Sequence, residues 1–298
     1  MTMPDKPGDC PIIATPFTPD GAIDYPSLEN ELRIIAEYGC EAATLFGVAS
    51  EFFKLSDDER VELAKFVADV CADVGVSLVV SVTHESTVVA VERAKQYEAI
   101  GADCIMVFPP RFMDPPAEAV VEHVRRIGEA VSVPVMVQHT DVNVDISPAT
   151  FAALNEAVPN VRYFKIEVSE PGAYISALLE ETDGRVGTLV GNWGFRMIDA
   201  YDRGAVGVMP IVLYDELYLE IHDRYVRGDR EGAVELHNEL LSALNYVQDI
   251  PAAKRLLAEQ GIIDSPHCRE PASDIGDDVD ERHIAEAHER MTALIDSI

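Results

Sequence analysis

Lys165 is the residue of this chain with the clearest capacity for covalent chemistry. It falls inside an apolar, β-rich run at 161–167, whereas the other lysines fall in the N-terminal tail, in a loop or on expected helices: Lys6, Lys54, Lys65, Lys95 and Lys254. A lysine on a buried strand loses hydration, which favours the neutral, nucleophilic amine. The pattern allows a covalent nucleophile or a structural cation paired with Glu167 or Glu51.

A turn of small residues, Gly47-Val48-Ala49-Ser50-Glu51, follows an expected strand at 42–46. Its backbone amides and the Ser50 hydroxyl can be aimed at a carboxylate, which such donors bind well. An ordinary turn between a strand and a helix is the alternative.

Two histidines, His84 and His139, each stand at the end of an expected strand, and imidazole titrates near neutrality. Because side chains alternate along a strand, His139 faces away from the sheet interior if Gln138 faces into it. Both histidines are candidates for proton transfer, with a supporting or surface role as the alternative. Trp193 can line a pocket or simply pack.

The elements that must position these groups alternate regularly. Short β-rich runs are expected at 11–15, 42–46, 77–83, 104–108, 134–138, 163–167, 187–190 and 206–209. Helical patterns are expected at 26–39, 56–73, 87–100, 117–131, 148–157, 171–182, 193–203 and 214–226. Eight such pairs predict an α/β fold, a (βα)8 TIM barrel over residues 1–228 with catalytic groups at the carboxyl ends of its strands. Further helical patterns predict a C-terminal helical appendage over 229–298.

The charge balance excludes some partners. With 53 acidic and 23 basic residues the net charge is −30, which argues against nucleic acid and against a membrane surface. Adaptation to high salt, where screening suppresses self-repulsion, is one explanation, and an ordinary acidic protein is the other.

Five scattered cysteines and the lack of a signal pattern predict a cytoplasmic protein. His283 and His288 lack the glutamate and spacing of a zinc helix, so no metal site is expected.

Several motifs together resemble the dihydrodipicolinate synthase / N-acetylneuraminate lyase family of class I aldolases and dehydratases. They are Ala14-Thr15-Pro16-Phe17, the turn at 47–51, Leu55-Ser56-Asp57-Asp58-Glu59-Arg60, Gly101-Ala102-Asp103, Pro109-Pro110, Phe164-Lys165, Gly191 and Gly204-Ala205-Val206-Gly207-Val208. The resemblance implies a Schiff base on Lys165 without a cofactor, and a homo-oligomer, either a tetramer or a dimer. It also implies a substrate site built from Gly47, Ala49, Ser50, Glu51, Phe112, Gly191, Asn192, Trp193 and Met209.

The chain departs from the family pattern at several functional positions. The threonines of the family's Gly-Thr-Thr-Gly-Glu turn are absent from 47–51, and Gln138 stands where the family has a proton-transferring tyrosine. A neutral amide cannot act as a general acid, so His84 or His139 is expected to move protons instead, while Gln138 orients a carbonyl or a water. Phe112 replaces a second tyrosine, and the position of a substrate-binding arginine falls near Asn143.

These departures predict a divergent lyase rather than a true dihydrodipicolinate synthase. The expected activity is that of a pyruvate-type aldolase or hydratase-aldolase acting on a 2-keto acid. A dehydratase of 2-keto-3-deoxy sugar acids, such as 5-dehydro-4-deoxyglucarate, or a deaminase that uses the same lysine is the first alternative. A non-catalytic member that binds a keto acid is the second.

Overall fold

The computed structural model describes residues 3–112, 114–142, 144–247, 249–271 and 281–298. The chain divides into two compact units, the first formed by Met1–Cys10 and Ser77–Met209 and the second by Pro11–Val76 and Pro210–Ile298. Lys165 belongs to the first unit, whereas the turn at 47–51 belongs to the second.

Parallel strands form the sheet of the first unit. They are β1 (Gly8–Asp9), β3 (Ser77–Ser81), β4 (Cys104–Val107), β5 (Val135–Thr140), β6 (Val161–Glu167), β7 (Gly187–Val190) and β8 (Gly207–Val208). Their order is β1-β8-β7-β6-β5-β4-β3. The register aligns Gln138 of β5 with Lys165 of β6, and Lys165 with Leu189 of β7, so these side chains share one face.

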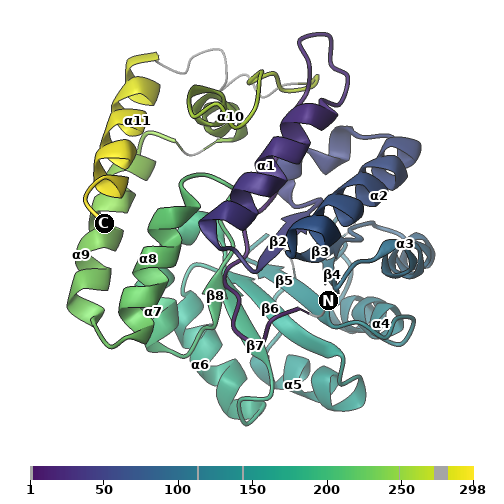
Figure 1. The fold of residues 1–298 in the computed structure, drawn as a ribbon. Helices are drawn as coiled ribbons and strands as arrows, with labels where there is room; N and C mark the ends of the chain where they lie inside the picture. The colour runs from purple at the N-terminus through teal and green to yellow at the C-terminus, as the bar shows by residue number, and fades with distance from the viewer. Residues whose placement is uncertain (1–2, 113, 143, 248, 272–280) are drawn as a thin grey trace. The chain divides into compact units, whose positions relative to one another are not determined.

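Helices follow the strands of this unit and cover their other face (Figure 1). They are α3 (Thr87–Ile100), α4 (Ala117–Gly128), α5 (Pro148–Ala157), α6 (Pro171–Glu181) and α7 (Met197–Asp202). Phe164 of β6 packs against Phe151 of α5, with ring centroids 4.9 Å apart. Since Phe164 points toward the helices, its neighbour Lys165 points to the opposite face, the barrel interior.

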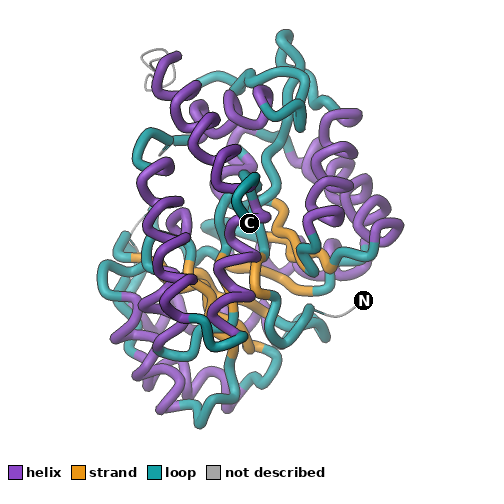
Figure 2. Tube along the Cα trace, turned by 60° about the vertical axis from the view of Figure 1, so that its left-hand side comes forward, coloured by secondary structure: helices purple, strands orange, loops and turns teal. Residues whose placement is uncertain are grey.

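The second unit contains β2 (Ala42–Leu45) and the helices α1 (Tyr25–Tyr38), α2 (Asp57–Val74), α8 (Asp215–Val226), α9 (Arg230–Leu244), α10 (Ile250–Glu259) and α11 (Glu281–Ile295). Ile12 forms parallel bridges with both Thr44 of β2 and Ile211. α9 packs against α8 and α11. Figure 2 colours the helices purple and the strands orange. Within the described ranges, no helix has the length and apolar character needed to cross a bilayer.

The predicted (βα)8 barrel with C-terminal helices is confirmed, because eight parallel strands alternate along the chain with α1–α8. The predicted first strand at 11–15 is wrong in position, since the ladder to β8 is formed by Gly8 and Asp9. Pro11 has no N–H to donate, which interrupts regular pairing before Ile12. The predicted domain boundary at 228 stays a prediction; α8 and α9, which flank it, both belong to the second unit.

Glu31 is a fully buried carboxylate on α1 of the second unit. Its Oε1 accepts a hydrogen bond of 2.7 Å from the Ala14 amide, and no described residue forms a hydrogen bond with Oε2. Burial raises the pKa of Glu31 well above its ordinary value, and the Ala14 amide offsets this only in part. The folded state therefore holds a proton that the unfolded state releases once the pH exceeds about 4.5.

The stability of the protein should consequently fall as the pH rises from that value through the folded-state pKa of Glu31. Glu31→Gln removes this contribution and keeps an acceptor for Ala14, so the variant should be more stable than wild type at pH 8 by on the order of 1 kcal/mol. Urea unfolding at pH 5 and pH 8 measures the difference. Glu37→Gln, on the exposed side of the same helix, is the control and should leave the pH dependence unchanged.

Candidate functional site

Lys165 and Glu167 form a lysine–carboxylate centre on β6. They are two residues apart and therefore share the interior face of the strand. Lys165 Nζ lies 3.2 Å from Glu167 Oε1, and the side chains are only 7% and 9% exposed. Near the carboxyl end of a barrel strand, such a shielded amine and carboxylate can exchange a proton and react with a bound electrophile.

Gln138 supports this centre from the neighbouring strand. It is the register partner of Lys165, and its Nε2 donates to Glu167 Oε2 over 2.5 Å. Gln138 therefore faces the interior of the barrel, as strand alternation allows. Its contact is with a carboxylate, however, and this was not foreseen from the sequence.

The loop after β7 closes the other side of Glu167. The Asn192 amide donates to Glu167 Oε1 over 3.0 Å. Asn192 and Trp193 both adopt left-handed backbone conformations, with φ of 50° and 58°. Such conformations cost about 1–3 kcal/mol each in residues other than glycine and gather at functional sites. Trp193 is half-buried in this loop, next to the residue that holds the carboxylate.

His139 does not join the centre. It pairs in register with Ile166 and points toward the helices, where its ring lies 4.7 Å from Tyr174 of α6 and 5.5 Å from Phe151 of α5. Burial lowers the pKa of His139. The catalytic role of His139 stays a prediction that these contacts do not support, because Gln138 takes the interior position by strand alternation.

His84 is half-buried in the loop after β3. Its Nδ1 accepts the Ser86 amide over 2.9 Å. Burial lowers the pKa of His123 on α4 to about 4, and the nearby His84 contributes in the same direction. A proton-transfer role for His84 stays a prediction that no contact with the centre supports.

Phe112 and Met209, which were predicted to contact the substrate, lie after the ends of β4 and β8. Phe112 is 79% exposed in the loop after β4, where its amide donates to Glu85 over 3.0 Å. Met209 is buried directly after β8, and its amide donates to Val190 over 2.8 Å. Asn143 falls outside the described residues. The substrate contacts predicted for Phe112 and Met209 remain untested.

The turn at 47–51 is held together by its own hydrogen bonds within the second unit. Ser50 Oγ donates to the Ile13 carbonyl over 2.6 Å, and Thr15 Oγ1 donates to the Ser50 carbonyl over 2.7 Å. A Cβ on Gly47 would lie 2.6 Å from Ile12, so this position requires glycine. The hydroxyl hydrogen of Ser50 is therefore used inside the protein. Carboxylate binding by Ala49 and the rest of this turn stays a prediction.

Glu51 has a structural partner that the sequence did not reveal. Its Oε2 lies 2.7 Å from Lys54 Nζ, and its Oε1 pairs with Nζ of Lys254. Lys254 is fully buried, and its Nζ also donates to the carbonyls of Thr15 and His267 over 2.6 and 3.1 Å. Both carboxylate oxygens of Glu51 are thus occupied by lysines, which argues for a structural rather than a substrate-binding role.

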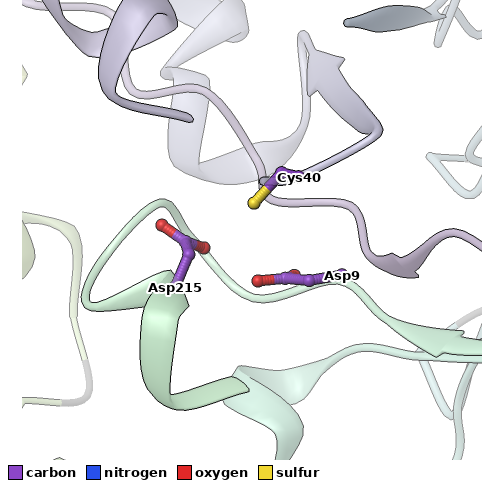
Figure 3. A group of neighbouring side chains, drawn as sticks. All are labelled: Asp9, Cys40 and Asp215. Atoms are coloured by element: carbon purple, nitrogen blue, oxygen red, sulfur yellow. The ribbon is translucent and has the colours of Figure 1, made fainter. Parts of the chain in front are cut away.

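Cys40 and Asp215 are buried in the second unit, with their ligand atoms within 4.8 Å of one another. Figure 3 draws the Cys40 and Asp215 side chains as sticks. One thiol and one carboxylate are fewer donors than a structural metal site uses. The prediction of no metal site stays a prediction.

The fold and the lysine–carboxylate centre place this protein among (βα)8 barrels that carry reactive groups at the carboxyl ends of their strands. The chain belongs to the dihydrodipicolinate synthetase family, whose family model matches residues 8–289. This confirms the resemblance inferred from the sequence motifs. The family comprises lyases and dehydratases that act on small molecules.

Individual relatives are distant but nearly full-length. The chain is 26% identical over 301 residues to an L-2-keto-3-deoxyarabonate dehydratase of Azospirillum brasilense, covering 98% of this chain and 96% of that protein. It is 27% identical to a 4-hydroxy-tetrahydrodipicolinate synthase of Haloarcula marismortui, covering 80% of this chain and 78% of that one. A crystal structure of a putative dihydrodipicolinate synthetase from Pseudomonas aeruginosa superposes with a TM-score of 0.87 at 26% identity, covering 96% and 99%.

Proposed function

We propose that this protein is a lyase that forms a Schiff base between Lys165 and a 2-keto acid such as pyruvate. The observation that carries this proposal is the placement of a shielded lysine amine 3.2 Å from a carboxylate on the interior face of β6. Membership of a family of aldolases and dehydratases supports it. Neither a metal nor an organic cofactor enters the proposed chemistry.

The reaction begins with neutral Lys165 Nζ bonding to C2 of the keto acid. The carbonyl oxygen takes up two protons in all and leaves as water, which gives a protonated imine. This cation is an electron sink, so C3 becomes acidic and an enamine can form. With a 4-hydroxy substrate, the protonated imine can instead accept the electrons of the C3–C4 bond, so that the bond breaks, the C4 hydroxyl loses its proton, and an aldehyde and the enamine are formed. The reverse of this step is aldol addition. Loss of a leaving group at C4 follows from the enamine formed by deprotonation of C3, and these routes cover aldolase and hydratase-aldolase activity.

Dehydration of a 2-keto-3-deoxy sugar acid is the second candidate. It is favoured by the Azospirillum relative, a dehydratase that aligns with 98% of this chain. The same imine serves this reaction, as it would serve a deaminase, without cleavage of a carbon–carbon bond. Product analysis separates the candidates, because pyruvate together with an aldehyde marks an aldolase. The resemblance in the sequence, which places Gln138 where the family pattern has a tyrosine, argues against a true dihydrodipicolinate synthase.

Borohydride reduction in the presence of pyruvate tests the imine. We expect intact mass to show one reduced keto-acid adduct per chain, and peptide mapping to place it on Lys165. No adduct with pyruvate or with other small 2-keto acids would overturn the proposal. If a keto acid then still bound, as measured by calorimetry, the protein would be a non-catalytic keto-acid-binding member of the family.

A further inference from the structure

We infer that Glu167 is the catalytic acid and base of this site, in place of the tyrosine that the family carries at the position of Gln138. The inference rests on the imine proposed above. Glu167 Oε1 lies 3.2 Å from Lys165 Nζ, whereas His139 faces the helices and the ring of His84 is bonded to its own loop. Of the proton-transferring groups considered, Glu167 is the one that contacts the reacting nitrogen.

The surroundings of Glu167 hold it in one place. Gln138 Nε2 donates to Oε2 over 2.5 Å, and the Asn192 amide donates to Oε1 over 3.0 Å. Gly191 leaves the space that the carboxylate occupies, because a Cβ there would lie 1.9 Å from Oε1. Two donors fix this carboxylate, and the Lys165 amine contacts it as well. Such a carboxylate is preorganised for repeated proton transfer. Gln138 is thereby a positioning residue for Glu167.

Lys165 and Glu167 together can give and accept every proton that formation of the imine requires. Lys165 gives one proton to Glu167, and the neutral amine bonds to C2 while the carbonyl π electrons move to oxygen. One of the two protons left on the nitrogen moves to that oxygen to give a hydroxyl, and the other stays on the nitrogen. Glu167 then protonates the hydroxyl, the carbon–oxygen bond breaks, and water leaves an iminium beside a carboxylate. The carboxylate next takes a proton from C3, and the electron pair of that bond forms the enamine.

Gly191→Ala tests the position of Glu167 without changing either reacting group. Gly191 has φ of −98°, outside the left-handed region, so the main effect of alanine there is the contact of its Cβ with Glu167. Since Glu167 must move, we expect the C3 proton exchange of pyruvate to slow by roughly 100-fold. Gly75→Ala is the control for lost stability, because Gly75 ends α2 with φ of 82° in the second unit and has no neighbour within 4 Å of a Cβ. An unchanged exchange rate in a folded Gly191→Ala protein would contradict the placement.

Glu167→Gln provides the decisive experiment, read by two signals on the same samples. Exchange of the pyruvate methyl protons in D2O, followed by NMR, reports C3 deprotonation, and borohydride trapping after long incubation reports the imine. We expect exchange to fall by roughly 10²- to 10⁴-fold while the trapped adduct still approaches one per chain. Glu170→Gln, an exposed carboxylate shortly after β6, is the control and should exchange like wild type.

The outcomes separate this inference from the proposed function. Wild-type exchange in Glu167→Gln would overturn the inference. So would a loss of exchange in proportion to a loss of adduct, because Glu167 would then merely hold Lys165. Partial recovery of exchange in Glu167→Asp, which keeps the carboxylate on a shorter side chain, supports the acid–base role. A wild-type protein that traps no keto acid would instead remove the proposed function itself.

Discussion

Replacing Lys165 by arginine is expected to abolish the borohydride-trapped adduct with pyruvate, from about one per chain to background. Arginine keeps the positive charge that faces Glu167 at 3.2 Å, so the ion pair and the fold should survive. Its guanidinium remains protonated in proteins and offers no nucleophilic lone pair. Any turnover that depends on the imine should be lost together with the adduct. Intact mass with and without pyruvate, followed by peptide mapping, measures both the loss and the modified position.

The control for this prediction is Lys95→Arg, an exposed lysine on α3 that should leave the adduct unchanged. Lys254 provides an internal control, because it is the more completely buried of the two buried lysines. Its Nζ already donates to Glu51, Thr15 and His267, and these hydrogen bonds hold the amine inside the protein. An adduct that persists in Lys165→Arg, or that maps to Lys254, would contradict the assignment.

The interior of the barrel could be predicted largely from strand alternation. A period of two places Lys165 and Gln138 on one face and turns His139 to the other, and the register shows this arrangement. The same rule places Glu167 beside Lys165, since the two are separated by one residue. The sequence therefore places the carboxylate correctly, although the pattern alone indicates it only as a structural partner of the lysine.

The contacts that complete the centre could not be predicted in this way. The Asn192 amide reaches Glu167 because the loop after β7 adopts left-handed conformations at two residues other than glycine. Propensity disfavours such conformations, so the sequence around them gives no warning.

The position of β1 also differs from the prediction. The apolar residues at 11–15 predict a strand there, whereas the ladder with β8 is formed by Gly8 and Asp9 and ends before Pro11.

The burial of Lys254 shows the limit of reasoning from local pattern. On α10 it follows an ordinary helical sequence, and its partner Glu51 lies 203 residues away along the chain. Burial lowers the pKa of Lys254, an effect that Glu51 partly offsets. A search for buried lysines alone would have selected Lys254 as the nucleophile. The acceptors around each amine distinguish the two, because Lys165 Nζ contacts one carboxylate oxygen among the described residues.

This buried ion pair predicts a large effect on stability. Lys254→Met removes the cation that faces Glu51 Oε1 and, with it, the amine that donates to the carbonyls of Thr15 and His267. Breaking one side of a buried pair typically costs about 3–5 kcal/mol, because the remaining charge stays buried. Lys54, which contacts Oε2 of the same carboxylate at 2.7 Å, should keep the loss toward the lower end of that range. Urea unfolding at constant salt measures the change in the free energy of unfolding.

The matched control is Lys65→Met, which removes an exposed lysine from α2 in the same unit and should change stability by less than about 0.5 kcal/mol.

The double variant Lys254→Met/Glu51→Gln adds a second test. Because it removes both charges of the contact, it should be more stable than the sum of the single losses predicts, with a coupling of roughly 1–3 kcal/mol. If Lys254→Met unfolded at the same urea concentration as Lys65→Met, the pair would not hold the turn that contains Glu51. Additive losses would show that Lys254 acts through the two carbonyls rather than through the carboxylate.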